Sequence, residues 1–119
     1  MTQSPSLSVI FMRQRVKSPR VVSGAPVTLE KAVFELLPQA GSVEVQRDPP
    51  DFTHAAHTHP TEETLLIVSG SITFDCDGRQ LECVSGDRLL LPEGTVHSSR
   101  AGANGCTYII ACHALGGAT

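Results

Sequence analysis

The stretch His57-Thr-His59-Pro-Thr-Glu-Glu63, with the apolar run that follows it to Gly70, decides how this chain is interpreted. Side chains of a β-strand alternate between two faces, so positions 57, 59 and 63 project to one side if residues 57–67 are extended. A second stretch, Gly86-Asp-Arg-Leu-Leu-Leu-Pro92-Glu-Gly94-Thr-Val-His97, ends another strand-like segment with a third imidazole. Three neutral nitrogens and one carboxylate suit a divalent first-row metal ion and leave positions for water or a ligand.

The first stretch resembles the first signature of the cupin family. His57-x-His59 is followed by three residues, Glu63, six residues and Gly70, which is the spacing of that signature. Asp51 stands six positions before His57, with five residues between them, where the family has a glycine, so we expect the chain to turn differently there.

The second stretch resembles the second cupin signature. Gly86 is followed by five residues, Pro92-x-Gly94, two residues and His97, while Ala101 replaces the asparagine that closes the family's pattern. Fifteen residues separate the two signatures, and the resemblance covers roughly residues 43–112. It implies an all-β fold, the double-stranded β-helix (jelly-roll) cupin barrel, here with one short N-terminal helix. It also implies a divalent transition metal ion (Fe, Mn, Ni, Co, Zn or Cu) and the following ligands: His57, His59, Glu63 and His97.

Length and charge limit the organisation and the partners. At 119 residues the chain has room for one domain. Residues 1–23 hold four basic residues and no acid, whereas the rest holds five basic residues against twelve acidic ones. An acidic body argues against nucleic acid as a partner, and no apolar run approaches the ~20 residues that cross a bilayer. We therefore expect a small-molecule ligand or substrate as the partner and neither nucleic acid nor membrane.

The basic N-terminal arm is interpreted as a poorly ordered extension over residues 1–24, with the single barrel domain at 25–115. A second interpretation is that the arm adds a strand to a neighbouring subunit. Small cupins commonly pair through edge strands, so the resemblance also implies a homodimer.

The four cysteines are expected to be reduced, which favours a cytoplasmic protein. Cys106 and Cys112 lie along one predicted strand, about 20 Å apart at the usual rise per residue. The predicted hairpin turn sets Cys76 opposite Arg79 rather than opposite Cys83. A cross-pair between the two sets stays open.

One helix and a series of short strands are predicted. Apolar residues at helical spacing indicate a helix over residues 28–37 with Thr28 as N-cap, covering an open edge or end of the sheet. Short apolar runs between turn residues indicate an antiparallel sandwich or barrel. The expected strands are residues 43–46, 52–59, 65–68, 71–76, 79–83, 88–91, 97–100 and 106–112. The last two are expected to pair with each other across residues 102–105.

Other polar residues near the signatures have ordinary interpretations. Glu62 has the opposite parity to Glu63 and is expected to face solvent or to support the metal site indirectly. His54 has the wrong parity to join His57 unless a bulge intervenes, and His113 is interpreted as a surface residue. Candidates for the wall beside the metal are Leu65, Ile67, Phe74, Leu89 or Leu91, Ser99 and Tyr108, each of which is also a plausible core residue.

Three functions are consistent with these patterns. The first is a small-molecule metalloenzyme, with dioxygenase-type chemistry ahead of isomerase or decarboxylase chemistry. Its catalytic residues are unknown, because Tyr108 and Glu62 are the only candidates for a general base. The second is a non-catalytic, metal-dependent sensor or binding protein. The third is a protein whose homodimer interface is its function.

Overall fold

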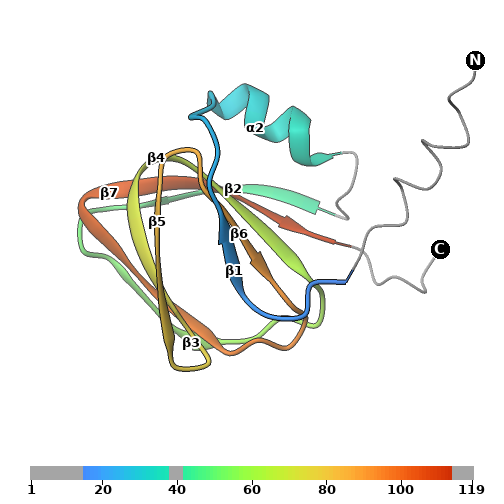
Figure 1. Cartoon of the computed structure of the whole chain (residues 1–119). Helices are drawn as coiled ribbons and strands as arrows, with labels where there is room; N and C mark the ends of the chain where they lie inside the picture. The colour runs from blue at the N-terminus through green and yellow to red at the C-terminus, as the bar shows by residue number, and fades with distance from the viewer. Residues whose placement is uncertain (1–14, 38–41, 114–119) are drawn as a thin grey trace, which may run out of the picture.

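The computed structural model describes residues 15–37 and 42–113 (Figure 1). Within them the chain forms one short helix and seven strands in an antiparallel arrangement. The elements are β1 (Arg20–Val22), α2 (Leu29–Leu36), β2 (Ser42–Asp48), β3 (Thr53–His57), β4 (Glu63–Cys76), β5 (Arg79–Val84), β6 (Arg88–Leu91) and β7 (His97–Cys112). The predicted all-β jelly-roll barrel with one short helix is confirmed.

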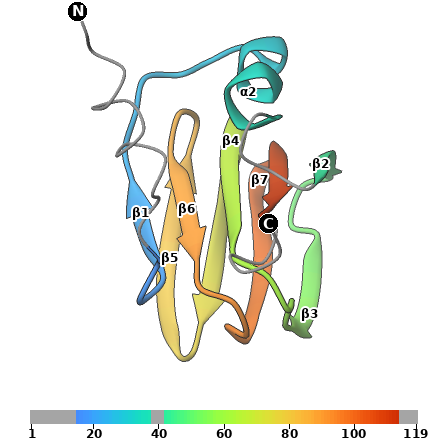
Figure 2. The same ribbon diagram turned by 90° about the vertical axis from the view of Figure 1, so that its right-hand side faces the viewer.

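Two long strands, β4 and β7, connect the two halves of the barrel. The strand order is β1-β6-β4-β7-β2, with β3 also paired to β7 and β5 also paired to β4. The first half of β4 pairs with β6, and its second half pairs with β5. β7 pairs with β4 through both halves, so each long strand belongs to both halves of the barrel. Figure 2 shows the two strands side by side.

The expected hairpin between residues 97–100 and 106–112 is wrong, because the two segments are halves of the continuous strand β7. Ser99 lies opposite Phe74 in one half, and Tyr108 lies opposite Ile67 in the other, so both halves pair with β4. The glycine-containing segment between them bends a strand instead of reversing it.

The bend in β4 requires a glycine. Gly70 has φ +80°, and a Cβ at this position would overlap the carbonyl oxygen of Gly105 in β7. The register between the two strands shifts around this residue. The two glycines therefore allow the long strands to cross at a corner of the barrel.

Helix α2 covers the outer face of the barrel. Thr28 is its N-cap, as expected, and accepts a hydrogen bond from the Lys31 amide. Ala32 and Leu36 pack on Leu66 and on neighbouring apolar residues of β7. The helix was expected at an edge or end of the sheet, but it lies over the sheet that β4 and β7 form (Figure 1). The outward-facing apolar residues of both strands need such a cover.

The N-terminal segment joins the sheet before residue 25. β1 pairs with β6, with Val21 opposite Leu89, and Arg79 donates a hydrogen bond to the Pro19 carbonyl oxygen. Part of the segment assigned to an extension is therefore an edge strand of the chain's own barrel, where it covers β6. Residues 1–14 lie outside the described residues.

All four cysteines are free, and Cys76 lies opposite Arg79 as predicted. Burial raises the pKa of Cys76 to about 11 and the pKa values of Cys83 and Cys106 to about 12, so these thiols remain protonated at neutral pH. No helix within the described residues has the length and apolar character to cross a membrane.

Candidate metal centre

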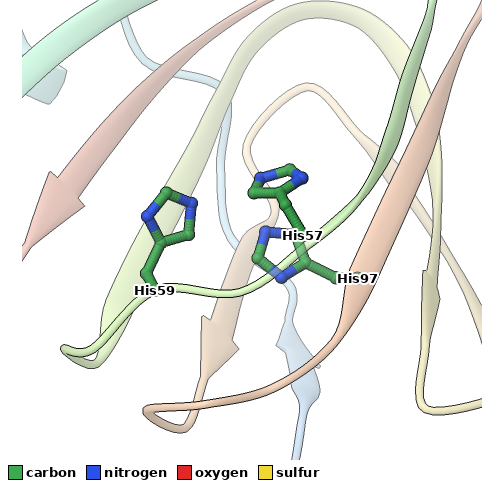
Figure 3. A group of neighbouring side chains, drawn as sticks. All are labelled: His57, His59 and His97. Carbon is green, nitrogen blue, oxygen red and sulfur yellow. The ribbon is translucent and has the colours of Figure 1, made fainter.

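Two of the predicted ligands meet across a strand pair. His57 is the last residue of β3, and His97, the first residue of β7, lies opposite it. Their ring centroids are 4.3 Å apart. Figure 3 shows both rings beside that of His59. His97 is buried, whereas His57 is exposed to solvent, so one side of the pair is accessible.

His59 and Glu63 reach the same place from a loop and a strand end. The expected extended run over residues 57–67 is not formed, because β3 ends at His57 and β4 begins at Glu63. The Gly94 amide donates a hydrogen bond of 2.9 Å to the His59 carbonyl oxygen. This bond ties the first signature to the turn before His97, so backbone contacts rather than strand parity bring the two signatures together.

The four predicted ligand residues converge. One nitrogen from each of the three histidines lies within 4.8 Å of the other two. The Glu63 carboxylate lies 3.3 Å from Nε2 of His59 and 3.8 Å from Nε2 of His97. Such a group of imidazole nitrogens beside a carboxylate has the chemistry that divalent transition metals prefer.

Backbone carbonyls orient two of the imidazoles. Nδ1 of His57 is 2.8 Å from the Ala55 carbonyl oxygen, and Nδ1 of His97 is 2.9 Å from that of Thr95. A carbonyl oxygen only accepts, so Nδ1 carries the proton in both rings and Nε2 keeps a lone pair. Metal-binding histidines in proteins typically make this kind of hydrogen bond.

Burial keeps the imidazoles in the neutral form that binds a cation, but it disfavours the ionised carboxylate. Desolvation lowers the pKa of His59 and of His97, and the neighbouring His57 lowers both further. These imidazoles are therefore neutral at pH 7. Desolvation raises the pKa of Glu63, which His97 and a 3.6 Å hydrogen bond from the Cys112 thiol partly offset. A bound cation would offset the cost of this buried carboxylate.

The cluster opens into a cavity of about 390 Å³ inside the barrel. The following described residues line it: Glu44, Gln46, His54, His57, His59, Glu63, Leu65, Phe74, His97, Ser99, Tyr108, Ile110 and Cys112. Four of the predicted wall residues are among them. Ile67, Leu89 and Leu91 belong to the core without lining the cavity, whereas Leu65, Phe74 and Tyr108 belong to both. No lysine or arginine is found among these lining residues, and Arg100, near the signatures, pairs with Asp51 at the surface.

A buried polar group behind the cavity wall, Asp48, contacts three of the residues that line the cavity. The Asp48 side chain is fully buried and accepts hydrogen bonds from the Tyr108 hydroxyl at 3.0 Å and from Gln46 at 2.9 Å. Its other partner is Nε2 of His54, at 3.0 Å. Asp48 precedes two prolines, and no sequence pattern indicates that the polar face of β2 points inward.

Two polar residues for which a surface position was expected are buried. Glu62 is buried rather than solvent-facing, and its carboxylate accepts a hydrogen bond from the Val16 amide. His113 is also buried, with Nε2 2.8 Å from the Thr64 hydroxyl. Asp51 has φ +62°, a left-handed conformation that aspartate adopts more often than most residues other than glycine.

Comparisons with known proteins agree with this fold. A family model described as the AraC-like ligand binding domain matches residues 40–113, more than half of the chain. A search of curated proteins finds no match. The QdtA 3,4-ketoisomerase from Thermoanaerobacterium thermosaccharolyticum, solved with TDP, superposes with a TM-score of 0.63 at 12% identity, over 83% of this chain and 82% of that one.

Two other solved structures are similar over a part of their own length. The DMSP lyase DddQ from Ruegeria pomeroyi DSS-3 has a TM-score of 0.58 at 22% identity, over 65% of this chain and 40% of that one. Oxalate decarboxylase from Bacillus subtilis, a protein with Mn(II) centres, has a TM-score of 0.58 at 21% identity, over 83% of this chain and 26% of that one. At these identities the likeness concerns the fold. With the family match, it shows that the chain belongs to the AraC-like ligand-binding domain family and has the cupin barrel fold.

Proposed function

We propose that this protein binds a divalent transition metal ion through His57, His59, Glu63 and His97, and that it acts on a small organic molecule in the barrel cavity. The observation that carries the proposal is the orientation of His57 and His97, whose Nδ1 atoms are bonded to carbonyl oxygens so that both Nε2 lone pairs remain available. Neutral imidazoles and an adjacent buried carboxylate fit Fe, Mn, Ni, Zn or Cu.

A metal ion bound there would polarise an oxygen atom of the ligand. The chain supplies the remainder of the site: Leu65, Phe74 and Ile110 form an apolar wall that excludes water. Because no lysine or arginine is found among the described lining residues, the cavity suits a ligand without a phosphate group. A volume of about 390 Å³ also suits a small ligand.

The polar residues that line the cavity bear on the reaction class. A dioxygenase-type reaction and an isomerase- or lyase-type reaction are both compatible with this ligand set. The second type also needs a side chain that moves a proton. The cavity contains His54 and Tyr108 in addition to the ligand cluster. This favours isomerase- or lyase-type chemistry over the dioxygenase chemistry that the sequence favoured.

A metal-dependent sensor is the second candidate function, and the match to an AraC-like ligand-binding domain favours it. The two functions differ in turnover. Oxygen consumption or product formation by the metal-loaded protein, on a panel of diketones, thiols, phenols and hydroxyketones, would support the enzyme. Co-purification of an unmodified ligand without turnover on that panel would support the sensor.

Metal content tests the proposal itself. The purified wild type, H59A and H97A proteins are loaded with Mn(II) or Zn(II), desalted and analysed for metal by mass spectrometry. We expect close to one ion per chain in the wild type and a loss of most of it in both variants. H54Q is the matched control, because His54 lines the same cavity but lies outside the three-histidine cluster. Equal metal content in H59A, H97A and the wild type would contradict the assignment.

The homodimer stays a prediction. β2 ends the strand order, and Val45 on this strand is 52% exposed. An edge strand with an exposed apolar residue is a suitable surface for pairing with a second copy. Light scattering after size exclusion would give the mass in solution, and V45E should shift a dimer to monomer, whereas V84E, at an exposed position of β5, should not.

A further inference from the structure

We propose that His54, oriented by the buried carboxylate of Asp48, is the acid–base group of the barrel cavity, and that it exchanges a proton with a small carbonyl compound bound beside the three-histidine cluster. The compound belongs to the class of α-hydroxy carbonyl compounds with an acidic hydrogen on carbon. This inference rests on the proposed function, because the cluster would hold the carbonyl oxygen of the compound.

A β-bulge brings His54 into the cavity. His54 lies opposite Ser99 and His57 lies opposite His97, so β3 advances three residues where β7 advances two. In a regular strand, residues three apart face opposite sides. The additional residue rotates the chain, and both His54 and His57 line the cavity. Bulges of this kind re-aim side chains at functional sites.

Asp48 determines which nitrogen of His54 carries the proton. Its carboxylate also receives a hydrogen bond from the Tyr108 hydroxyl, whose pKa is raised by burial and by Asp48 itself, so Tyr108 stays protonated and remains a donor. An ionised carboxylate only accepts hydrogen bonds, so Nε2 of His54 must be the donor to Asp48. The proton of the neutral ring therefore lies on Nε2. Nδ1 therefore keeps a lone pair, and no described residue forms a hydrogen bond with it.

The arrangement is the reverse of that in the two oriented metal-ligand candidates. In His57 and His97 the Nδ1 proton is bonded to a backbone carbonyl, and Nε2 faces the cluster. In His54 the Nε2 proton is bonded to a buried carboxylate that stabilises the positive charge when Nδ1 gains a proton. The Asp48 carboxylate already has Tyr108 and Gln46 as partners, so it does not require His54 for its own solvation. The His54 side chain is also 32% exposed, which permits contact with a ligand.

The proton transfer balances within the cavity. Nδ1 of His54 takes a proton from the hydroxyl-bearing carbon next to the carbonyl group. The electron pair of that C–H bond forms the C=C bond of an enediolate. The carbonyl π pair moves to oxygen. The imidazolium formed is paired with Asp48. Return of the proton to the same carbon gives exchange, and return to the former carbonyl carbon, with transfer of the hydroxyl proton to the former carbonyl oxygen, gives isomerisation; neither needs an oxidant or a reductant.

The class of compound follows from the lining. Glu44 and Glu63 are carboxylates, and no lysine or arginine lines the described part of the cavity. A neutral chelating molecule therefore fits better than one that carries several anionic groups. Hydroxyacetone is a small neutral probe that has a carbonyl group, a hydroxyl group for chelation and exchangeable hydrogens on carbon.

The first test measures hydrogen–deuterium exchange into hydroxyacetone in D₂O by proton NMR, with Zn(II)-loaded wild type, H54Q and R100A. Arg100 lies outside the cavity and serves as the control. We expect exchange in the wild type and in R100A, and a decrease of about 100-fold or more in H54Q at unchanged zinc content. The side chain introduced by H54Q retains an amide N–H for Asp48, so a folding defect is not expected.

The second test requires no activity. Long-range ¹H–¹⁵N correlation NMR reports which nitrogen of His54 is protonated, in metal-free and in zinc-loaded protein. We expect the Nε2–H form in the wild type and a larger share of Nδ1–H in D48N, because an amide no longer requires a donor on Nε2. A purely structural histidine would show no coupling between this tautomer and the exchange rate.

The outcomes separate the two proposals. Equal exchange in H54Q and the wild type, no exchange in zinc-loaded wild type, or an Nδ1–H tautomer in the wild type would each overturn the role of His54 while leaving the metal site intact. Equal metal content in wild type, H59A and H97A would instead overturn the metal assignment, and this inference with it.

Discussion

His57 and His97 lie opposite each other at the ends of β3 and β7, and each donates its Nδ1 proton to the carbonyl oxygen two residues before it. The same short-range hydrogen bond therefore orients two rings that are far apart in the sequence. The strand pairing then brings the two Nε2 atoms to one location. Local backbone geometry provides the tautomer, and the β3–β7 register provides the proximity.

Two adjacent glutamates should differ in their effect on metal binding. E63A removes a carboxylate that lies 3.3 Å from His59 Nε2, and we expect a loss of at least about tenfold in metal affinity. E62A removes an acceptor for the Val16 amide, so we expect near wild-type metal content but faster limited proteolysis at the N-terminal segment. Calorimetric metal titration and mass mapping of the fragments check both. Equal losses of affinity would contradict the choice of Glu63 over Glu62 as the ligand.

The metal-free protein should become more stable when Glu63 is neutralised. Burial raises its pKa above the ordinary value of 4.5, so the ionised form is disfavoured in the folded state relative to the unfolded state. The contribution of this group to stability is fully present below pH 4.5 and is lost as the pH rises through the folded-state pKa. We expect E63Q to raise the Tm of chelator-treated protein by a few degrees at pH 7 and to have little effect at pH 4. A lower Tm for E63Q at pH 7 would contradict this.

Protonation of the histidines should act in the opposite pH direction. The pKa values of His59 and His97 are lowered from 6.5, mainly by burial, so the unfolded chain binds protons that the folded chain does not. The metal-free protein should therefore lose stability as the pH falls below 6.5, until the folded-state pKa values are reached. Urea unfolding between pH 7 and pH 5 measures this slope, and H97Q should reduce it. An unchanged slope in H97Q would assign the effect to other groups.

Gly70 should tolerate alanine much less than Gly78 does. Both have positive φ, at +80° and +87°, so each substitution costs about 1–2 kcal/mol for the left-handed conformation. At Gly78 the added Cβ meets nothing within 4 Å, whereas at Gly70 it overlaps the backbone of Gly105. We expect the free energy of unfolding of G70A to fall by clearly more than that of G78A, as measured by urea denaturation. Similar losses would mean that the crossing of β4 and β7 can relax.

The Tyr108–Asp48 hydrogen bond should contribute measurably to stability. Y108F removes one donor from a fully buried carboxylate, and we expect a cost of about 1.5–3 kcal/mol. In the D48N background the same change should cost less, because a neutral amide makes a weaker acceptor. Urea denaturation of the four proteins gives the coupling energy. A coupling near zero would indicate that solvent or Gln46 replaces the hydroxyl.

The sequence alone predicted the four residues that converge at the candidate site, the helix and the class of fold. These predictions rest on sequence spacing and on local preference. The spacing of the two signatures identifies His57, His59, Glu63 and His97, and Thr28 caps the helix through a hydrogen bond that involves only nearby residues. The hairpin at Cys76–Arg79 was also predicted, because the register of a hairpin follows from its two-residue turn.

Residues whose orientation depends on a partner strand could not be predicted. Alternation along β2 puts Glu44, Gln46 and Asp48 on one face of the strand and the residues between them on the other. It does not indicate which of the two faces points into the barrel. The bulge that redirects His54 exists only as a difference in register between β3 and β7. The segment around Gly102–Gly105 has the composition of a turn, and only its pairing with β4 makes it part of a continuous strand.

The sequence by itself thus determined which side chains are available for a metal ion, because ligand chemistry and spacing are properties of the chain. The tertiary structure decided which further groups line the same cavity, His54 and Tyr108, and bonded both to the buried Asp48 from a third strand. The physical reason is that the two faces of a strand are equivalent until another element covers one of them. Polar groups on the covered face are then buried, and they must form hydrogen bonds with one another.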